Sequence, residues 1–326
     1  MDILFIIIGI AVVLHGADNL TEGAVNVARR FKMSELVIGL TVVAFGTSMP
    51  EMCVSLASAL NGTADMAVGN VVGSNIFNIF LIVGVCAMIH PMSVGMSAIR
   101  RDLPFAFIAT LMLIFFLVDG TLTKGEALIM LALFVLYMYC TLRNAKETDA
   151  NDNAAMMNAA AATAQTQKAN HGAFLTAVMK TYRFPAVRIM IGLAELIIGS
   201  DVFVGHAVSL ATTLGVSEAV IGITILGAGT SMPELATSVV AALKGSTSMA
   251  LGNVIGSCLF NILMILGVTA VVTPLSPQGI TATDLACLFA GSLLLWFFSF
   301  TKNTMERWEG FVLTASFGVY MYLLLA

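Results

Sequence analysis

Charged residues are scarce in this sequence. They make up 10% of its 326 residues, whereas apolar residues make up 59% and the mean hydropathy is +0.96. Soluble globular domains carry about 25% charged residues, so this composition excludes an ordinary soluble protein and predicts a polytopic membrane protein. The formal net charge of −4 is too small to indicate a nucleic-acid or membrane-surface partner, and nothing in the sequence implies a protein partner.

Motifs of catalysis and of soft-metal binding are also missing. No GxSxG or HExxH element occurs, and an intramembrane aspartate dyad would require Asp18 and Asp201 to approach each other. An intramembrane hydrolase is therefore the weakest alternative, and we expect neither an enzyme nor an organic cofactor. The cysteines have no paired spacing and lie in or beside apolar stretches, so we expect five buried small residues and no disulfide or metal cluster. They are Cys53, Cys86, Cys140, Cys258 and Cys287.

Long apolar stretches are abundant. About 20 apolar residues span the ~30 Å of bilayer hydrocarbon, and ten such stretches can be placed. The first lacks a basic start and is followed by further spans, so it is interpreted as a helix and not as a signal peptide. The predicted spans are 3–28, 34–60, 65–90, 102–118, 124–142, 186–213, 217–243, 247–273, 281–300 and 307–325.

The sequence repeats itself at an offset of 183 residues. Segments 38–93 and 221–276 share 29 identities in 56 positions without a gap, including a GTSMPE block in each. This block places one glutamate, Glu51 or Glu234, inside each apolar stretch. A duplicated membrane segment with an acid at its centre indicates a transporter.

Basic residues predict how the two copies are oriented, because cytoplasmic loops retain lysine and arginine. If both termini lie outside, fourteen of the fifteen basic residues fall on the cytoplasmic side and only Lys124 falls outside. With five spans per half, the second copy crosses the membrane in the opposite sense. We therefore expect an all-α membrane protein of ten transmembrane helices, built as two inverted five-helix repeats with broken helices at the midplane.

The expected organisation has three parts. Residues 1–142 form the first repeat, with its motif at 38–93, and residues 185–326 form the second, with its motif at 221–276. Between them, 143–184 is rich in Ala, Asn, Thr and Gln. Such a segment buries too little apolar surface to offset chain entropy, so it is predicted to be a disordered cytoplasmic linker.

The GTSMPE block predicts a break in a membrane helix. Pro50 removes a backbone donor and clashes with the carbonyl four residues earlier, so carbonyls near Ala44 to Thr47 should lose their helical partners. Freed carbonyls at membrane depth require a cavity or an ion. The same argument applies to 227–230 before Pro233.

The polar side chains near each glutamate are oxygen ligands. Thr47 and Ser48 stand four and three residues before Glu51, which places both hydroxyls on its helix face. Carboxylates, hydroxyls and carbonyls suit hard cations, and calcium tolerates irregular cages better than magnesium does. A capping box of Ser48 and Glu51 is the structural alternative. Two glutamates at mid-membrane, at a cost of roughly 2.5–3.5 kcal/mol each, favour ion binding.

The third span of each half supplies a second polar line, in GNxxGSxxFN blocks. Serine and the second asparagine lie four residues apart on one face, whereas the glycines at the same spacing are typical of close helix packing. We expect Asn78 and Asn261 to lie beside the glutamates. Asn70 and Asn253 fit a structural role equally well.

These paired blocks resemble the alpha-repeats of the calcium/cation antiporter superfamily, in particular its prokaryotic sodium/calcium exchanger branch. The resemblance covers both halves of the chain. It implies that calcium and sodium compete for the glutamates, that the serines of the third spans line flanking sodium sites, and that the first and sixth spans slide during alternating access. The metal ligands implied are Glu51, Glu234, Thr47, Ser48, Thr230, Ser231, Ser74, Ser257, Asn78 and Asn261.

Asparagine at both 78 and 261 departs from relatives that carry an acid there, which leaves potassium dependence and stoichiometry unassigned. We predict a calcium/sodium antiporter of the cytoplasmic (inner) membrane. A proton/calcium antiporter and a cation channel remain alternatives. Asp18 and Asp201 are repeat-related acids for which structural pairing is favoured over ion binding, and no clear role is assigned to His15, His206, Glu22 and Glu195.

Overall fold

The computed structural model describes residues 1–144, 185–215, 227–300 and 302–325. Almost all of the predicted linker 143–184 and the first part of the predicted span 217–243 lie outside these described residues.

The first half of the chain is helical from its second residue. It contains three π-helical segments, η1 to η3, and one short strand, β1. The elements are α1 (Asp2–Phe31), α2 (Glu35–Ile38), η1 (Gly39–Val43), α3 (Ala44–Thr47), α4 (Met49–Leu60), α5 (Ala64–Ile76), η2 (Phe77–Ile82), α6 (Val83–Ile89), β1 (Met92–Ser93), η3 (Ala98–Asp102), α7 (Leu103–Phe116) and α8 (Lys124–Asn144).

The second half repeats this order where it is described. Helix boundaries recur at the offset of 183 that the sequence shows, so that α4, α5 and η2 correspond to α14, α15 and η5. The elements are α11 (Pro185–Thr213), α13 (Gly227–Gly229), α14 (Met232–Leu243), α15 (Thr247–Leu259), η5 (Phe260–Ile265), α16 (Leu266–Val272), α17 (Ala282–Phe300), β2 (Thr304–Met305) and α18 (Arg307–Leu325).

Two short backbone contacts join the halves, and the sequence did not predict them. Met92 of β1 pairs antiparallel with Met305 of β2, and an isolated bridge joins Leu122 to Leu275. Since 275 is 92 plus 183 and 305 is 122 plus 183, each contact is the repeat counterpart of the other. The two halves therefore meet through reciprocal surfaces.

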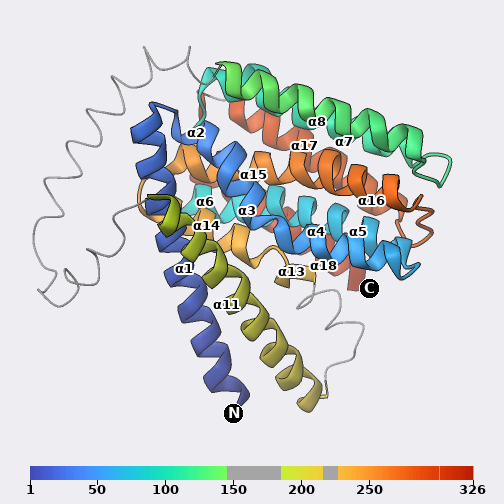
Figure 1. The fold of residues 1–326 in the computed structure, drawn as a ribbon, viewed down its shortest axis with the longest axis horizontal. Helices are drawn as coiled ribbons and strands as arrows, with labels where there is room; N and C mark the ends of the chain where they lie inside the picture. The colour runs from blue at the N-terminus through green and yellow to red at the C-terminus, as the bar shows by residue number, and fades with distance from the viewer. Residues whose placement is uncertain (145–184, 216–226, 301, 326) are drawn as a thin grey trace, which may run out of the picture.

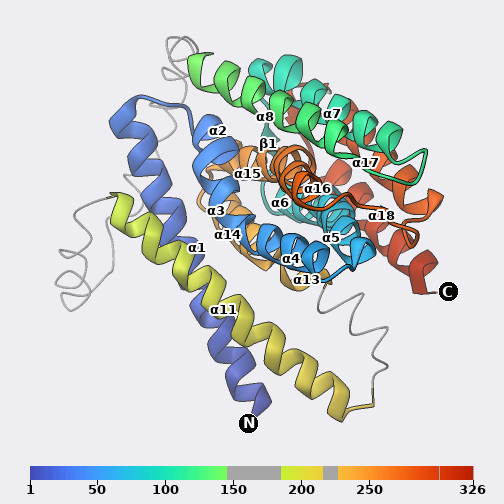
Figure 2. The same ribbon diagram turned by 45° about the vertical axis from the view of Figure 1, so that its right-hand side comes forward.

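Helices α1 and α11 form a pair that runs obliquely past the other helices (Figure 1, Figure 2). The pair packs closely because glycines remove side chains from its contact. A methyl group added at Gly192 would lie 2.6 Å from the backbone nitrogen of Leu20, and one at Gly16 would lie 2.9 Å from the Gly192 carbonyl oxygen. The N-terminus lies at the far end of α1 (Figure 1).

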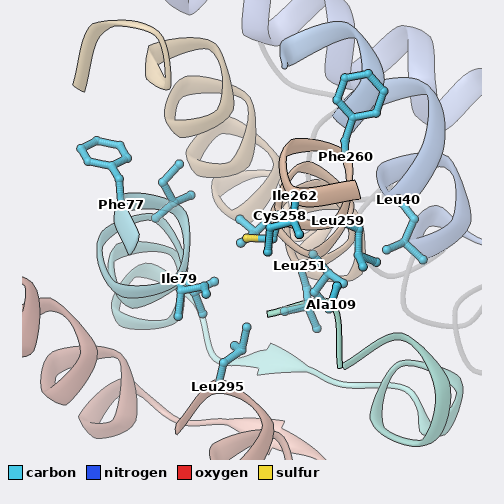
Figure 3. Close-up of a cluster of buried hydrophobic side chains, with 14 of the residues drawn as sticks. Leu40, Phe77, Ile79, Ala109, Leu251, Cys258, Leu259, Phe260, Ile262 and Leu295 are labelled. Carbon is cyan, nitrogen blue, oxygen red and sulfur yellow. The ribbon is translucent and has the colours of Figure 1, made fainter. Parts of the chain in front are cut away.

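Helix α15 lies at the centre of the remaining bundle. All of its residues except Ser248 are buried. Its side chains meet Leu40 of η1, Ala109 of α7 and Ile79 of η2 in one apolar cluster (Figure 3). This central helix and its counterpart α5 carry the predicted site serines Ser257 and Ser74, and the π-helical segments that follow them, η5 and η2, carry Asn261 and Asn78.

The described residues include five helices long and apolar enough to cross a membrane: Asp2–Phe31, Ala64–Ile89, Lys124–Arg143, Thr247–Val272 and Ala282–Phe300. A sixth candidate is the bent pair Glu35–Thr47 and Met49–Leu60, which meet at 45°. Large apolar side chains such as Phe115, Val118 and Tyr322 are more than 70% exposed. Outward apolar surface of this kind is suited to lipid.

Candidate functional site

The two glutamates of the repeats occupy the same place in the fold. Glu51 lies in the first turn of α4 and Glu234 in the first turn of α14, and each follows a proline in that turn. Proline is favoured at a helix start because its missing N–H would have no partner there. Both side chains are fully buried. The break between α3 and α4 thus places a carboxylate in the interior at the beginning of a new helix.

Each glutamate is hydrogen-bonded by the serine of the other repeat. Ser48 Oγ donates to Glu234 Oε1 at 2.8 Å, and Ser231 Oγ donates to Glu51 Oε1 at 3.1 Å. Neither serine caps its own helix through its side chain, so the capping box is not formed. Ser48, which the sequence spacing places on the helix face of Glu51, thus donates to the glutamate of the other half, because the two halves interlock.

Threonine and asparagine reinforce the same crosswise contact. Thr47 Oγ1 donates to Asn253 Oδ1 at 3.2 Å, and Thr230 Oγ1 donates to Asn70 Oδ1 at 3.2 Å. These two asparagines therefore brace the broken helix of the opposite half. The structure supports the structural role that the sequence left open for them.

The asparagine amides also hold the helix of their own half. Asn70 Nδ2 donates to the Glu51 carbonyl oxygen at 3.2 Å and to Ser55 Oγ at 3.0 Å. Asn253 Nδ2 donates to Ser238 Oγ at 3.0 Å and lies 3.5 Å from the Glu234 carbonyl oxygen. Sequence reasoning missed Ser55 and Ser238, although each stands four residues after its glutamate.

A second group of polar atoms is buried without a hydrogen-bond partner in the described part of the chain. Both amide atoms of Asn78 and of Asn261 belong to it, as do the Ser74 hydroxyl and the second carboxylate oxygen of each glutamate. Such atoms cost free energy unless something pairs with them. Ser257 differs from Ser74, because its hydroxyl lies 3.5 Å from Glu234 Oε1.

The backbone at the break departs from one expectation. The Ala44 carbonyl does not lose its partners: it accepts from the Ser48 N–H at 3.0 Å and lies 3.4 Å from Thr47 Oγ1. Thr47 Oγ1 also lies 3.1 Å from the Val43 carbonyl oxygen, so its single hydrogen is shared between the backbone oxygens and Asn253 Oδ1. The threonine hydroxyl thus partly replaces the backbone donors that the bend removes.

The donor set consists of oxygens from carboxylates, hydroxyls and amides. Among the described residues there is no group of three or more His, Cys, Asp and Glu side chains placed to hold a metal ion. The buried oxygens without a partner are of the kind that hard cations such as calcium or sodium prefer. A site of two carboxylates and several neutral oxygens suits an ion that must both bind and be released.

Polar residues of α1 and α11 lie outside this central group. Asp18 does not pair with Asp201 but with Lys244, at 2.5 Å. Glu195 binds His15 at 3.0 Å and Asn19 at 2.9 Å. The other residues without an assigned role also have ionic partners: His206 pairs with Asp2, and Glu22 with Arg188 and Lys244.

The sequence profile of the sodium/calcium exchanger protein family matches residues 1–143 and 184–326. The chain belongs to this family. The predicted antiporter superfamily and its prokaryotic branch are therefore confirmed. Members are membrane antiporters and not a class of enzymes.

Curated relatives match along nearly the whole chain. The putative antiporter CaxA of Alkalimonas amylolytica is 35% identical over 98% of both chains. The inner membrane protein YrbG of Escherichia coli K12 is 31% identical, covering 98% of this chain and 95% of its own. The sodium/calcium exchanger MaX1 of Methanosarcina acetivorans is 30% identical over 99% of this chain and 98% of its own.

Solved structures of the sodium-calcium exchanger NCX_Mj share this fold. The structure soaked with 2.5 mM Na+ and 0.1 mM Ca2+ has a TM-score of 0.80 at 28% identity, covering 100% of this chain and 98% of that chain. One soaked with 10 mM Na+ and 10 mM Sr2+ gives the same score. The chain is thus a cation/calcium antiporter of the membrane by family and fold.

Proposed function

We propose that this protein exchanges calcium for sodium across the cytoplasmic membrane by alternating access, with the ions competing for Glu51 and Glu234. One observation carries the proposal. Each glutamate has one oxygen held by a serine of the other repeat, while its second oxygen is buried without a partner in the described chain. A relative named as a sodium/calcium exchanger supports the choice of ions.

The proposed ligands fall into two groups. The glutamates would take calcium or sodium at the centre, with hydroxyl oxygens from the helix breaks beside them. The serines of α5 and α15 would complete flanking sodium sites, and the two orphaned asparagine amides would close the centre. The full set is Glu51, Glu234, Thr47, Ser48, Thr230, Ser231, Ser74, Ser257, Asn78 and Asn261, and all of these except Thr230 are buried.

We further propose ten transmembrane helices in two inverted repeats, 1–142 and 185–326, joined by a cytoplasmic linker at 143–184. Reciprocal contacts support this topology. Two copies related by a two-fold axis make each contact twice, so that a contact between two residues is repeated between their counterparts. Ser48 with Glu234 and Ser231 with Glu51 follow this rule. The basic residues favour both termini outside.

Charge explains why exchange would be obligatory. Two ionised carboxylates in a site without water are costly unless they are neutralised. Calcium supplies two positive charges in one ion, whereas sodium must supply them with more than one. If only the neutralised site can change its access from one side to the other, calcium moving one way requires sodium moving the other.

Radiolabelled calcium uptake into proteoliposomes tests this proposal. Proteoliposomes with the wild-type protein should take up calcium when they are loaded with sodium, and this uptake should stop when the sodium gradient is removed. Glu51→Gln and Glu234→Gln should each lower uptake by roughly two to four orders of magnitude, because a buried charge partner contributes about 3–5 kcal/mol. Glu306→Gln, the same change at an exposed hydrogen-bonded glutamate outside the site, should leave uptake unchanged.

The outcomes separate the alternatives. Uptake that follows a pH gradient and ignores sodium would indicate a proton/calcium antiporter. Calcium flux that needs no counter-ion gradient, together with single-channel currents, would indicate a channel. Undiminished sodium-driven exchange in both glutamate variants would refute the assignment of the site.

A further inference from the structure

The α1–α11 pair is tied to the bundle by charge at one place. Lys244 follows the last residue of α14. Its Nζ lies 2.5 Å from Asp18 Oδ1 and 3.1 Å from Glu22 Oε1, both on α1. Glu22 is also paired with Arg188 of α11. Lys244 thus joins the end of α14, whose first turn holds Glu234, directly to α1 and, through Glu22 and Arg188, to α11.

The tight packing of α1 against α11 makes this attachment important. Their backbones approach through Gly16 and Gly192, where even a methyl group would meet the facing backbone at under 3 Å. Helices packed this closely move as one body, because sliding one along the other would either open a gap between them or force their atoms to overlap. An ion pair at Lys244 therefore acts on the position of the whole pair.

The repeat provides a natural comparison, because the attachment exists in only one copy. At the offset of 183, Lys244 corresponds to Asn61, Asp18 to Asp201 and Glu22 to Gly205. Asn61 carries no charge, and among the described residues no ion pair joins α11 to α4. The exchanger is thus symmetric at its central site and asymmetric in this contact.

We propose that Lys244 is a positioning residue that latches the α1–α11 pair against the end of α14, closing that side of the path to the glutamates and favouring the state open on the other side. The proposal rests on the function proposed above. By the distribution of basic residues, the latched side is cytoplasmic. Its groups are partly exposed, with side chains 29%, 44% and 40% accessible at Lys244, Asp18 and Glu22.

Partial exposure suits a contact that must break in every transport cycle. Exposed ion pairs are weak, so we expect the latch to shift the balance between the two states by about two- to fivefold and not to lock it. The apparent affinity on one side depends on the fraction of molecules open to that side. Removing the latch should therefore weaken calcium binding on the side opposite Lys244 and strengthen it on the Lys244 side.

The experiment compares half-saturating calcium concentrations on the two faces, in right-side-out and inside-out vesicles. Lys244→Asn, which installs the counterpart residue, should change the ratio of the two values about two- to fivefold. Lys244→Arg keeps the charge and should keep the wild-type ratio. Asn61→Lys places a lysine at the counterpart position of the other repeat, where it would pair with Asp201 once α11 approaches α4, and should change the ratio in the opposite direction. Choline chloride should move wild type toward Lys244→Asn by screening, and should not move that variant.

A second measurement does not depend on transport. Amide hydrogen exchange at 240–246 and 14–22 should rise in Lys244→Asn and stay at the wild-type rate in Lys244→Arg. An unchanged affinity ratio in Lys244→Asn, or equal effects of Asn and Arg, would overturn the latch. Absence of sodium/calcium exchange in wild type would refute the proposed function instead, and hydrogen exchange would still decide whether the latch exists.

Discussion

Two buried asparagines in one helical segment should respond oppositely to the same substitution. Asn253 and Asn261 are both at most 1% exposed. The Asn253 side chain accepts from Thr47 at 3.2 Å and donates to Ser238 at 3.0 Å, with a third contact at 3.5 Å. Asn261 has no side-chain hydrogen bond within the described chain. We predict that the first asparagine stabilises the fold and that the second serves the ion.

The expected magnitude follows from the hydrogen bonds. Truncation to alanine leaves a similar cavity at both positions, so the difference between the variants isolates the polar contacts. At about 1 kcal/mol for each hydrogen bond, Asn253→Ala should be less stable than Asn261→Ala by about 2–3 kcal/mol. For a chain of this length, this corresponds to a melting temperature lower by roughly 3–4 °C.

Thermal unfolding in detergent, followed by circular dichroism with and without calcium, would measure this difference. Without calcium, Asn253→Ala should melt well below wild type and Asn261→Ala should melt closer to it. Calcium should raise the melting temperature of Asn253→Ala, because ligand binding stabilises the native state, and should have a smaller effect on Asn261→Ala. Equal melting temperatures without calcium, or an equal calcium effect on both variants, would refute the division between bracing and ion-binding asparagines.

Two further predictions concern the crosswise contact and the helix pair. Ser48→Ala and Ser231→Ala should weaken calcium-dependent exchange by similar factors of about ten- to hundredfold, because each removes one hydrogen bond to a buried carboxylate, worth about 1.5–3 kcal/mol. Half-saturation measurements on both variants would show it, and a large effect of only one serine would argue against reciprocity. Gly192→Val should destabilise the protein by about 3 kcal/mol through overpacking. Gly205→Ala, with no atom within 4 Å of the added methyl, should be neutral or slightly stabilising. Melting curves would distinguish the two variants, and equal losses of stability would contradict the role of the close α1–α11 contact.

The sequence alone determined the membrane class, the repeat and the candidate ligands. Hydropathy placed the spans, because a helix that crosses a membrane must be apolar along its length. The ungapped repeat pointed to Glu51 and Glu234, and Pro50 indicated a break in the helix just before it; α3 ends at Thr47 and α4 begins at Met49. These are local properties of composition and backbone chemistry, which a single chain displays without knowledge of its neighbours.

Only the tertiary structure decided which residues serve which glutamate. Spacing along one helix placed Ser48 beside Glu51, but packing of the halves directs its hydroxyl to Glu234. The same packing separates Asn253, which is fully hydrogen-bonded, from Asn261, whose amide remains without a partner in the described chain. Contacts between residues about 180 positions apart depend on how helices pack, and periodicity within a helix carries no information about its partner.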